Sequence, residues 1–149
     1  RKKMHIASCL AGLSFNAASL GINHSLAHQL GAHFHIAHGR ANAMLLPHII
    51  EYNSMITKNS RSQKTYPRQV EKYCTIARLL GVQNFNTVTT IRALVAWVQF
   101  MLQTGKCTRA EYFKAIPDMA EAALQDACTP TNPRQPSKDD IMEIYERLW

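Results

Sequence analysis

A long stretch near the start of the chain carries no formally charged side chain. Between Met4 and Gly39 there is no Lys, Arg, Asp or Glu. The same stretch holds six of the seven histidines of the chain, namely His5, His24, His28, His33, His35 and His38. Charged residues are rarely buried, so a segment without them is expected to lie in the interior. Because histidine is also a common metal ligand and a proton-transfer group near pH 7, we expect the function to reside here.

The remaining composition favours a single helical domain. A chain of 149 residues is long enough to bury a hydrophobic core. Gly and Pro number only six each, while residues that favour helices are frequent. No segment shows the sustained period-two alternation of a half-buried strand. We therefore predict an all-α helical bundle of about seven to eight helices.

Apolar periodicity and end signals give the expected helix bounds. Residues 4–20 are expected to form a buried helix, because small residues recur there at helical spacing. Gly31 and Gly39 are expected to break helices, Pro117 to open one, and Ser137 to cap the last one. The expected helices are 4–20, 22–32, 39–53, 67–80, 87–103, 117–127 and 137–149, with loops at 54–65 and 128–136. Thr108 and Glu111 resemble a capping box and would open one further helical segment before 117.

Three cations, Arg1, Lys2 and Lys3, directly precede the first helix. Positive charge at a helix N-terminus opposes the helix macrodipole. We therefore expect this helix to begin further upstream and the chain to be part of a longer protein. Asn16, Asn23 and the histidines interrupt the apolar run of about 18 residues that a membrane span requires, so neither a span nor a signal peptide is expected.

The net charge of +7 comes largely from one region. Between Lys58 and Arg78, six basic residues accompany a single acidic one, Glu71. A nucleic-acid surface is one interpretation. A solvated helix face with a basic loop is the one we favour, since no glycine-rich phosphate loop, zinc-finger spacing or basic–aromatic alternation is found.

The cysteines indicate a reducing environment. Four are present, and their spacing fits neither a disulfide framework nor a zinc ribbon. Reduced thiols are typical of a cytosolic protein, so a cytoplasmic location is expected. The four cysteines are Cys9, Cys74, Cys107 and Cys128.

His24 and His28 are four residues apart, so on a helix they share one face and could chelate one metal ion. The glutamate of the helical zinc motif HExxH is missing, however. His38 lies 14 residues after His24, a rise of about 21 Å in one helix, so it can join them only if the chain reverses. A metal or catalytic role and a hydrogen-bonded structural role are evenly balanced on this evidence alone. His33 and His35 are interpreted as packing or pocket-rim residues, and His5 and His48 as structural.

Three further blocks carry a resemblance to a known family. They are GLSFN at 12–16, LGINHSLAHQLG at 20–31 and HGRANA at 38–43, and CTPTNPR at 128–134 with Asp139-Asp140-Ile141 reinforces them. Together they resemble the iron-dependent (group III) alcohol dehydrogenases over nearly the whole chain. Ala37 and Arg40 depart from that pattern, where the family usually has Pro and a Leu or Val.

The resemblance implies a role for individual residues. His24 and His38 match the two downstream metal ligands of the family, so the chelating pair would be this distant one rather than His24 with His28. His28 matches the histidine near the nicotinamide and substrate, with a proton-transfer role. Phe15 and Cys128 fall where the family lines its substrate pocket.

The resemblance also implies the architecture. Residues 1–149 would be the C-terminal all-helical metal and substrate domain, dehydroquinate synthase-like and incomplete, of a two-domain enzyme. The missing N-terminal domain would bind NAD(P), and the missing upstream helix would supply the other ligands of Fe²⁺ or Zn²⁺. The substrate would be a small alcohol or aldehyde, the enzyme a homo-oligomer, and its location the cytoplasm or a bacterial microcompartment within it. The isolated chain is expected to be inactive.

Two alternative functions, from other classes of protein, remain open on the sequence. One is a non-catalytic helical metal-binding domain. The other, less favoured, is a basic helical module that binds nucleic acid. The alcohol, the choice between NAD and NADP, and the metal are not fixed by the residues.

Overall fold

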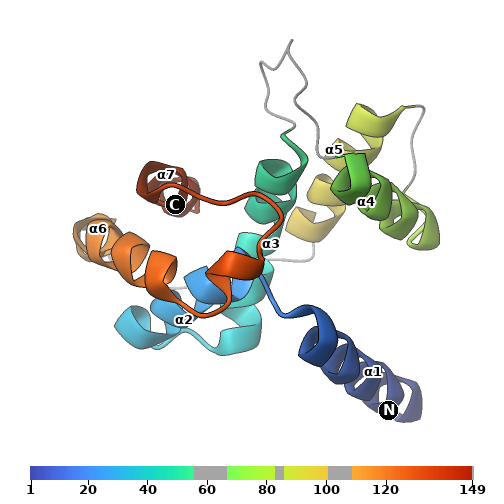
Figure 1. Ribbon diagram of the computed structural model, residues 1–149, viewed down its shortest axis with the longest axis horizontal. Helices are drawn as coiled ribbons and strands as arrows, with labels where there is room; N and C mark the ends of the chain where they lie inside the picture. The colour runs from blue at the N-terminus through green and yellow to red at the C-terminus, as the bar shows by residue number, and fades with distance from the viewer. Residues whose placement is uncertain (56–66, 83–85, 101–108, 149) are drawn as a thin grey trace.

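The computed structural model describes residues 1–55, 67–82, 86–100 and 109–148 (Figure 1). Every regular element in these ranges is a helix, which confirms the predicted all-α fold. The elements are α1 (Lys2–Ala18), α2 (Ile22–Phe34), α3 (His38–Ser54), α4 (Pro67–Leu79), α5 (Thr87–Phe100), α6 (Arg109–Gln125), the 3₁₀ turn η1 (Thr129–Thr131) and α7 (Lys138–Glu146).

Two hydrophobic clusters hold α2 to α7 together, and α3 contributes to both. The larger cluster joins α2, α3, α6 and α7, with Leu26, Leu45, Ile116 and Ile141 completely or almost completely buried. Side chains of this size each contribute about 1.5–3 kcal/mol when fully buried. The smaller cluster joins the end of α3 to α4 and α5 through residues such as Ile50, Val70, Ala77, Ile91 and Val95. Figure 1 shows the two groups of helices on either side of α3.

The expectation that the first helix is buried is wrong for this chain. α1 forms as predicted, but it projects away from the other helices (Figure 1), and none of its residues is buried. Met4 is 73% exposed and Leu13 is 66% exposed. The absence of charge shows that a helix face requires a covering partner; it does not show that the partner lies among the described residues.

Three predicted helix boundaries are also wrong. Gly31 lies inside α2 and Gly39 inside the first turn of α3, whereas the break falls at His35, which takes a left-handed conformation with φ of 53°. Pro117 lies inside α6 instead of opening a helix. A proline there removes one backbone hydrogen bond, but α6 is held from both sides by packing against α2 and α7. Tertiary packing therefore overrides the local signals.

The last helix begins as predicted. The Ser137 hydroxyl accepts a hydrogen bond from the Asp140 backbone N–H, and the Asp140 carboxylate accepts one from the Ser137 backbone N–H, which completes a capping box. The helix ends at Glu146 rather than at residue 149. The predictions at 56–65, Leu102, Gly105, Cys107, Thr108 and Trp149 lie outside the described residues. Cys9, Cys74 and Cys128 are free thiols, as expected.

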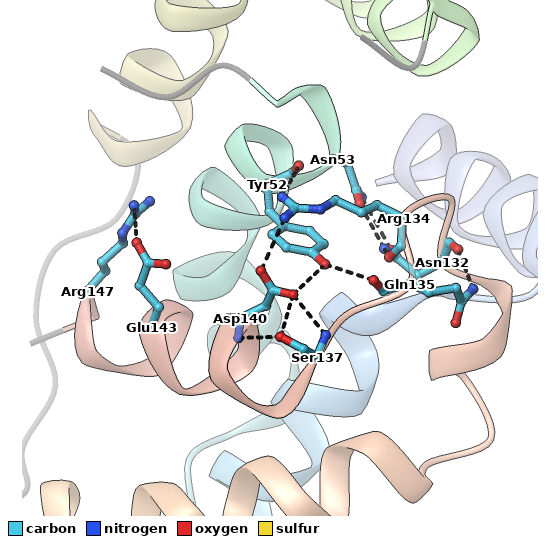
Figure 2. Close-up of polar contacts among 9 residues, drawn as sticks. All are labelled: Tyr52, Asn53, Asn132, Arg134, Gln135, Ser137, Asp140, Glu143 and Arg147. Atoms are coloured by element: carbon cyan, nitrogen blue, oxygen red, sulfur yellow. Dashed lines mark hydrogen bonds and ion pairs between the residues drawn. The ribbon is translucent and has the colours of Figure 1, made fainter. Parts of the chain in front are cut away.

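The segment before α7 is fixed to α3 by the polar network drawn in Figure 2. Asn132 and Asn53 exchange two side-chain hydrogen bonds, of 2.8 and 3.3 Å. The Arg134 guanidinium lies 3.7 Å from the centre of the Tyr52 ring and pairs with Asp140 at 3.1 Å. This network fixes the path of the chain that leads from α6 through η1.

In the described part of the chain no single helix has the length and apolarity to cross a bilayer. Among the described helices, only the pair of α1 and α2 has that length and apolarity when taken together, and a bend of 109° separates the two.

Candidate functional site

Three histidine rings gather where α2 and α3 begin. His24 lies in the first turn of α2, His28 one turn later, and His38 is the first residue of α3. The ring centres are 5.2 Å apart for His24 and His38, 5.4 Å for His28 and His38, and 6.3 Å for His24 and His28. The chain therefore reverses between His24 and His38, as a shared metal ion would require, and it does so at residues 35–37 rather than at the two glycines.

The start of α2 is held by side chains from η1 and the residue after it. Gly21, its N-cap, has no side chain, and the backbone N–H groups of Gly21 and Ile22 donate to Thr131 Oγ1 and Asn132 Oδ1. A Cβ on Gly21 would lie 3.1 Å from Asn132 Oδ1, and Gly21 has φ of +68°. A residue without a side chain is therefore required three positions before His24, the first metal-ligand candidate of α2.

His24 is suited to bind a cation. Its Nδ1 is buried and has no hydrogen-bond partner among the described residues. Burial lowers the pKa of His24, and the neighbouring His38 and His28 lower it further, while Asp126 opposes them. The ring is therefore neutral at pH 7, which is the form that ligates metals. His48 also has a buried Nδ1 without a partner in the described structure, but only His24 has it beside two other imidazoles.

His38 is exposed and contacts an asparagine one turn later. The Asn42 side-chain amide lies 3.0 Å from His38 Nε2, and it also donates to the His38 carbonyl. Asn23, from α2, donates to Asn42 Oδ1 at 2.7 Å, which fixes how the amide is turned. His38 Nε2 therefore faces a donor and carries its lone pair there. A cation bound at this nitrogen would replace the hydrogen bond from Asn42.

His28 is paired with a carboxylate that sequence reasoning missed. Asp126 follows the end of α6, and its Oδ2 lies 2.8 Å from His28 Nδ1. Its Oδ1 accepts from the Ser25 hydroxyl at 3.2 Å and from the Cys128 backbone N–H at 2.8 Å. Burial raises the pKa of Asp126, but the bonds from His28 and Cys128 outweigh it, so the pKa lies below its ordinary value. The carboxylate is thus ionised at neutral pH.

The structure brings Cys128 to this group through the hydrogen bond between its backbone N–H and Asp126. Cys128 is half-buried, and burial together with Asp126 raises the pKa of its thiol, which stays protonated at neutral pH. Phe15 lies near the end of α1, and 49% of it is exposed. His33 and His35 are exposed too, which favours a position at a rim over packing in the core.

The described residues offer imidazole ligands but no complete metal shell. No group of three or more His, Cys, Asp or Glu in the described ranges is arranged to hold a metal ion. Two rings that share one tetrahedral ion through nitrogen atoms have centres about 5 Å apart. The 5.2 Å between His24 and His38 and the 5.4 Å between His28 and His38 are both close to this value, but the buried Nδ1 without a partner belongs to His24. The arrangement can supply two imidazole nitrogen ligands and, at His28, a group oriented for proton transfer.

Sequence comparison places these features in a known family. The model of the "Fe-containing alcohol dehydrogenase family, C-terminal" matches residues 1–149. The chain is 36% identical to the 1-propanol dehydrogenase PduQ of Salmonella typhimurium, over 99% of this chain and 40% of that protein. It is 40% identical to the NADPH-dependent butanol dehydrogenase of Clostridium saccharobutylicum, over 100% of this chain and 38% of that protein. The chain thus spans about two-fifths of the length of these relatives.

Solved structures give the same result for the fold. A 1,3-propanediol oxidoreductase matches with a TM-score of 0.75 and 32% identity, over 96% of this chain and 36% of that one. An iron-containing alcohol dehydrogenase from Thermococcus thioreducens matches with a TM-score of 0.76 and 28% identity, over 97% and 35%. These matches confirm the resemblance that the sequence blocks carry.

Proposed function

This chain belongs to the Fe-containing alcohol dehydrogenase family, and from that premise we propose that it forms part of the metal and substrate site of an NAD(P)-dependent enzyme. The enzyme interconverts primary alcohols and aldehydes. The observation that supports this most is the gathering of His24, His28 and His38, because it joins two imidazole nitrogen ligands to a third imidazole that a carboxylate orients.

We propose that His24 and His38 hold the divalent cation, Fe²⁺ or Zn²⁺. The fit rests on the buried, unpartnered Nδ1 of His24, on the neutrality of that ring, and on the ring separation. Imidazole suits both iron and zinc. Two nitrogen ligands do not complete a shell, so the remaining ligands would come from the part of the enzyme beyond the matched region.

The chemistry then divides between the bound groups and this chain. A bound cation would supply Lewis acidity at the alcohol oxygen, and a bound nicotinamide would supply the acceptor or donor of hydride. His28 takes the alcohol proton in oxidation and returns it in reduction, through the ring nitrogen that Asp126 leaves open. Cys128, a protonated thiol beside Asp126, contributes a weakly polar wall to the substrate pocket, and Phe15 an apolar one.

We further propose that the apolar residues of α1 are covered in the full-length enzyme by its remaining domain, which also binds NAD(P). The support is the exposure of Met4, Leu10 and Leu13 on a helix that has no buried residue, together with the greater length of the relatives. Hydrogen exchange would then show α1 amides that exchange rapidly in the 149-residue chain and slowly in the full-length enzyme. Equal rates in the two proteins would contradict this.

The roles of the three histidines are tested by substitution in the full-length enzyme. His24→Ala and His38→Ala are expected to lower both the bound metal and the alcohol-dependent reduction of NAD(P). His28→Ala is expected to keep the metal and lose turnover. His33→Ala, at an exposed histidine of the same helix, is the matched control and should change neither. A His28 variant that loses its metal would make His28 a ligand instead, and a full-length enzyme without alcohol turnover would refute the proposed activity.

A further inference from the structure

The carboxylate beside His28 is held more firmly than a surface ion pair requires. The Asp126 side chain is only 15% exposed, whereas His28 is 42% exposed. Besides His28, Asp126 binds the Ser25 hydroxyl and the Cys128 backbone N–H. The Thr129 hydroxyl lies 2.8 Å from Ser25 Oγ and extends the network into the core. The carboxylate therefore has one fixed position from which to orient the histidine ring.

This position determines where the ring hydrogen lies. An ionised carboxylate only accepts hydrogen bonds, so the contact of 2.8 Å requires a hydrogen on His28 Nδ1. With Nδ1–H directed at Asp126, a neutral His28 has its lone pair on Nε2. A ring flip would break the contact, so this tautomer and this orientation are maintained together.

We propose that Asp126 is a positioning residue for proton transfer: it holds Nδ1–H of His28 and keeps Nε2 as the nitrogen that exchanges a proton with the alcohol. The kinetic part of this inference rests on the proposed function of His28. The structural part, the Nδ1–H tautomer, does not. Asp126 acts through His28 and needs no contact with substrate.

The network makes the effect of Asp126→Asn specific. The Cys128 N–H is a fixed donor, so the amide oxygen of the new asparagine must take the place of Oδ1. Its NH₂ group then takes the place of Oδ2 and points at His28 Nδ1. A donor now faces this nitrogen, which must give up its hydrogen, and the neutral ring changes to the Nε2–H tautomer.

The structural part is tested on the metal-free 149-residue chain by ¹⁵N NMR of the His28 ring. The nitrogen shifts should report Nδ1–H in the unsubstituted chain and Nε2–H in Asp126→Asn. The matched control is Glu121→Gln, which makes the same change on α6 in an exposed pair with Lys138 and should leave the His28 shifts unchanged. An Nε2–H ring in the unsubstituted chain, or the same tautomer in the unsubstituted chain and in the Asp126→Asn variant, overturns the proposal.

The kinetic part is tested in the full-length enzyme. General acid–base catalysis contributes about 10²–10⁴-fold, and His28 is partly exposed, so Asp126→Asn should lower kcat by about 10- to 100-fold. KM for the alcohol should change by less than about threefold, and the bound metal should not change. If Asp126→Asn does not fold, Asp126→Ser, too short to reach Nδ1, should give a comparable loss. Full activity of the variant overturns the positioning role, whereas an inactive unsubstituted enzyme refutes the proposed function and leaves the NMR result standing.

Discussion

The contact between Asn132 and Asn53 is expected to contribute strongly to stability, because Asn132→Ala removes several buried hydrogen bonds at once. Asn132 gives two short bonds, to Asn53 Oδ1 at 2.8 Å and to the Arg134 carbonyl at 2.6 Å. It also accepts two longer ones, from Asn53 at 3.3 Å and from the Ile22 N–H at 3.4 Å. A hydrogen bond contributes about 0.5–1.5 kcal/mol net, and a stranded buried group costs about 1–3 kcal/mol. We expect a loss of about 3 kcal/mol, with the longer bonds counted at the low end.

Thermal and urea denaturation of the 149-residue chain would measure this loss. For a chain of this length, about 3 kcal/mol corresponds to a fall in Tm of roughly 6–12 °C. Part of the loss is the stranding of Asn53, which is buried. In the double variant Asn53→Ala/Asn132→Ala neither side chain remains to be stranded. The stability loss of the double variant should therefore be smaller than the sum of the two single losses, by about 1–2 kcal/mol.

Asn86→Ala provides the control for this double-mutant cycle. Asn86 accepts a hydrogen bond from the Thr89 N–H at the start of α5, and its exposed side chain has no bond to Asn132 in the described structure. The losses of Asn86→Ala and Asn132→Ala should add to within about 0.5 kcal/mol. If the losses of Asn53→Ala and Asn132→Ala also added to within about 0.5 kcal/mol, the reasoning would be refuted, since neither amide would then depend on the other.

Three further outcomes follow from other parts of the structure. Gly21→Ala should destabilise the chain by about 1–3 kcal/mol in urea denaturation, because Gly21 has a positive φ and a Cβ there would approach Asn132. Gly12→Ala, in α1 with open space around it, should be neutral or slightly stabilising. Equal effects of the two substitutions would contradict this. Burial raises the pKa of Asp140, but the bonds from Ser137 and the guanidinium of Arg134 outweigh it and hold the pKa below its ordinary value. The stabilisation from Asp140 is therefore present above the unfolded-state pKa of about 3.9 and is lost as pH falls through the folded-state pKa. Asp140→Asn should be less stable than the unsubstituted chain at pH 7 and equally stable at low pH, and a difference that persists in acid would contradict the assignment. Finally, the 149-residue chain alone should show no NAD(P)-dependent alcohol turnover and should bind Zn²⁺ weakly by calorimetry, so turnover or submicromolar affinity would show that its ligands suffice.

The sequence predicts those features that depend on local pattern. Apolar periodicity identifies the helices from 22 onward, except that it divides α6 at Pro117. The Ser137 cap is correct because its partner Asp140 is three residues away. The gathering of His24 with His38 needs a reversal of the chain between them, which the sequence makes plausible and the structure contains. What fails locally is the choice of the breaking residue, since Gly31 and Gly39 are accepted inside helices that tertiary packing stabilises.

The features that the sequence does not predict depend on distant segments. Asp126 is 98 residues away from His28, and nothing near either residue indicates the pairing. The only local signal is that Asp126 lies two residues before Cys128, the first residue of a block that resembles the family. The exposure of α1 depends in the same way on whether a covering partner is present. The Asp126 carboxylate of this same chain contacts His28, although the charge-free stretch itself contains no carboxylate.

The ion pair of His28 and Asp126 is expected to contribute little to the stability of the fold, so stability does not account for it. Removing a carboxylate from water costs free energy that an ion pair recovers only in part, so an apolar pair at the same place would stabilise the fold about as well. The exposed pair of Lys138 and Glu121 avoids this cost, since both partners remain in water. Asp126 is instead largely buried, and it follows the end of α6, which packs on α2. Leu26 of α2 and Ala120 and Ala123 of α6 belong to the larger hydrophobic cluster. A variant that loosens this packing, such as Ala123→Gly, should therefore disturb the His28 tautomer before it unfolds the chain. Tautomer and unfolding transitions that coincide in urea would show that the core and the site are a single cooperative unit instead.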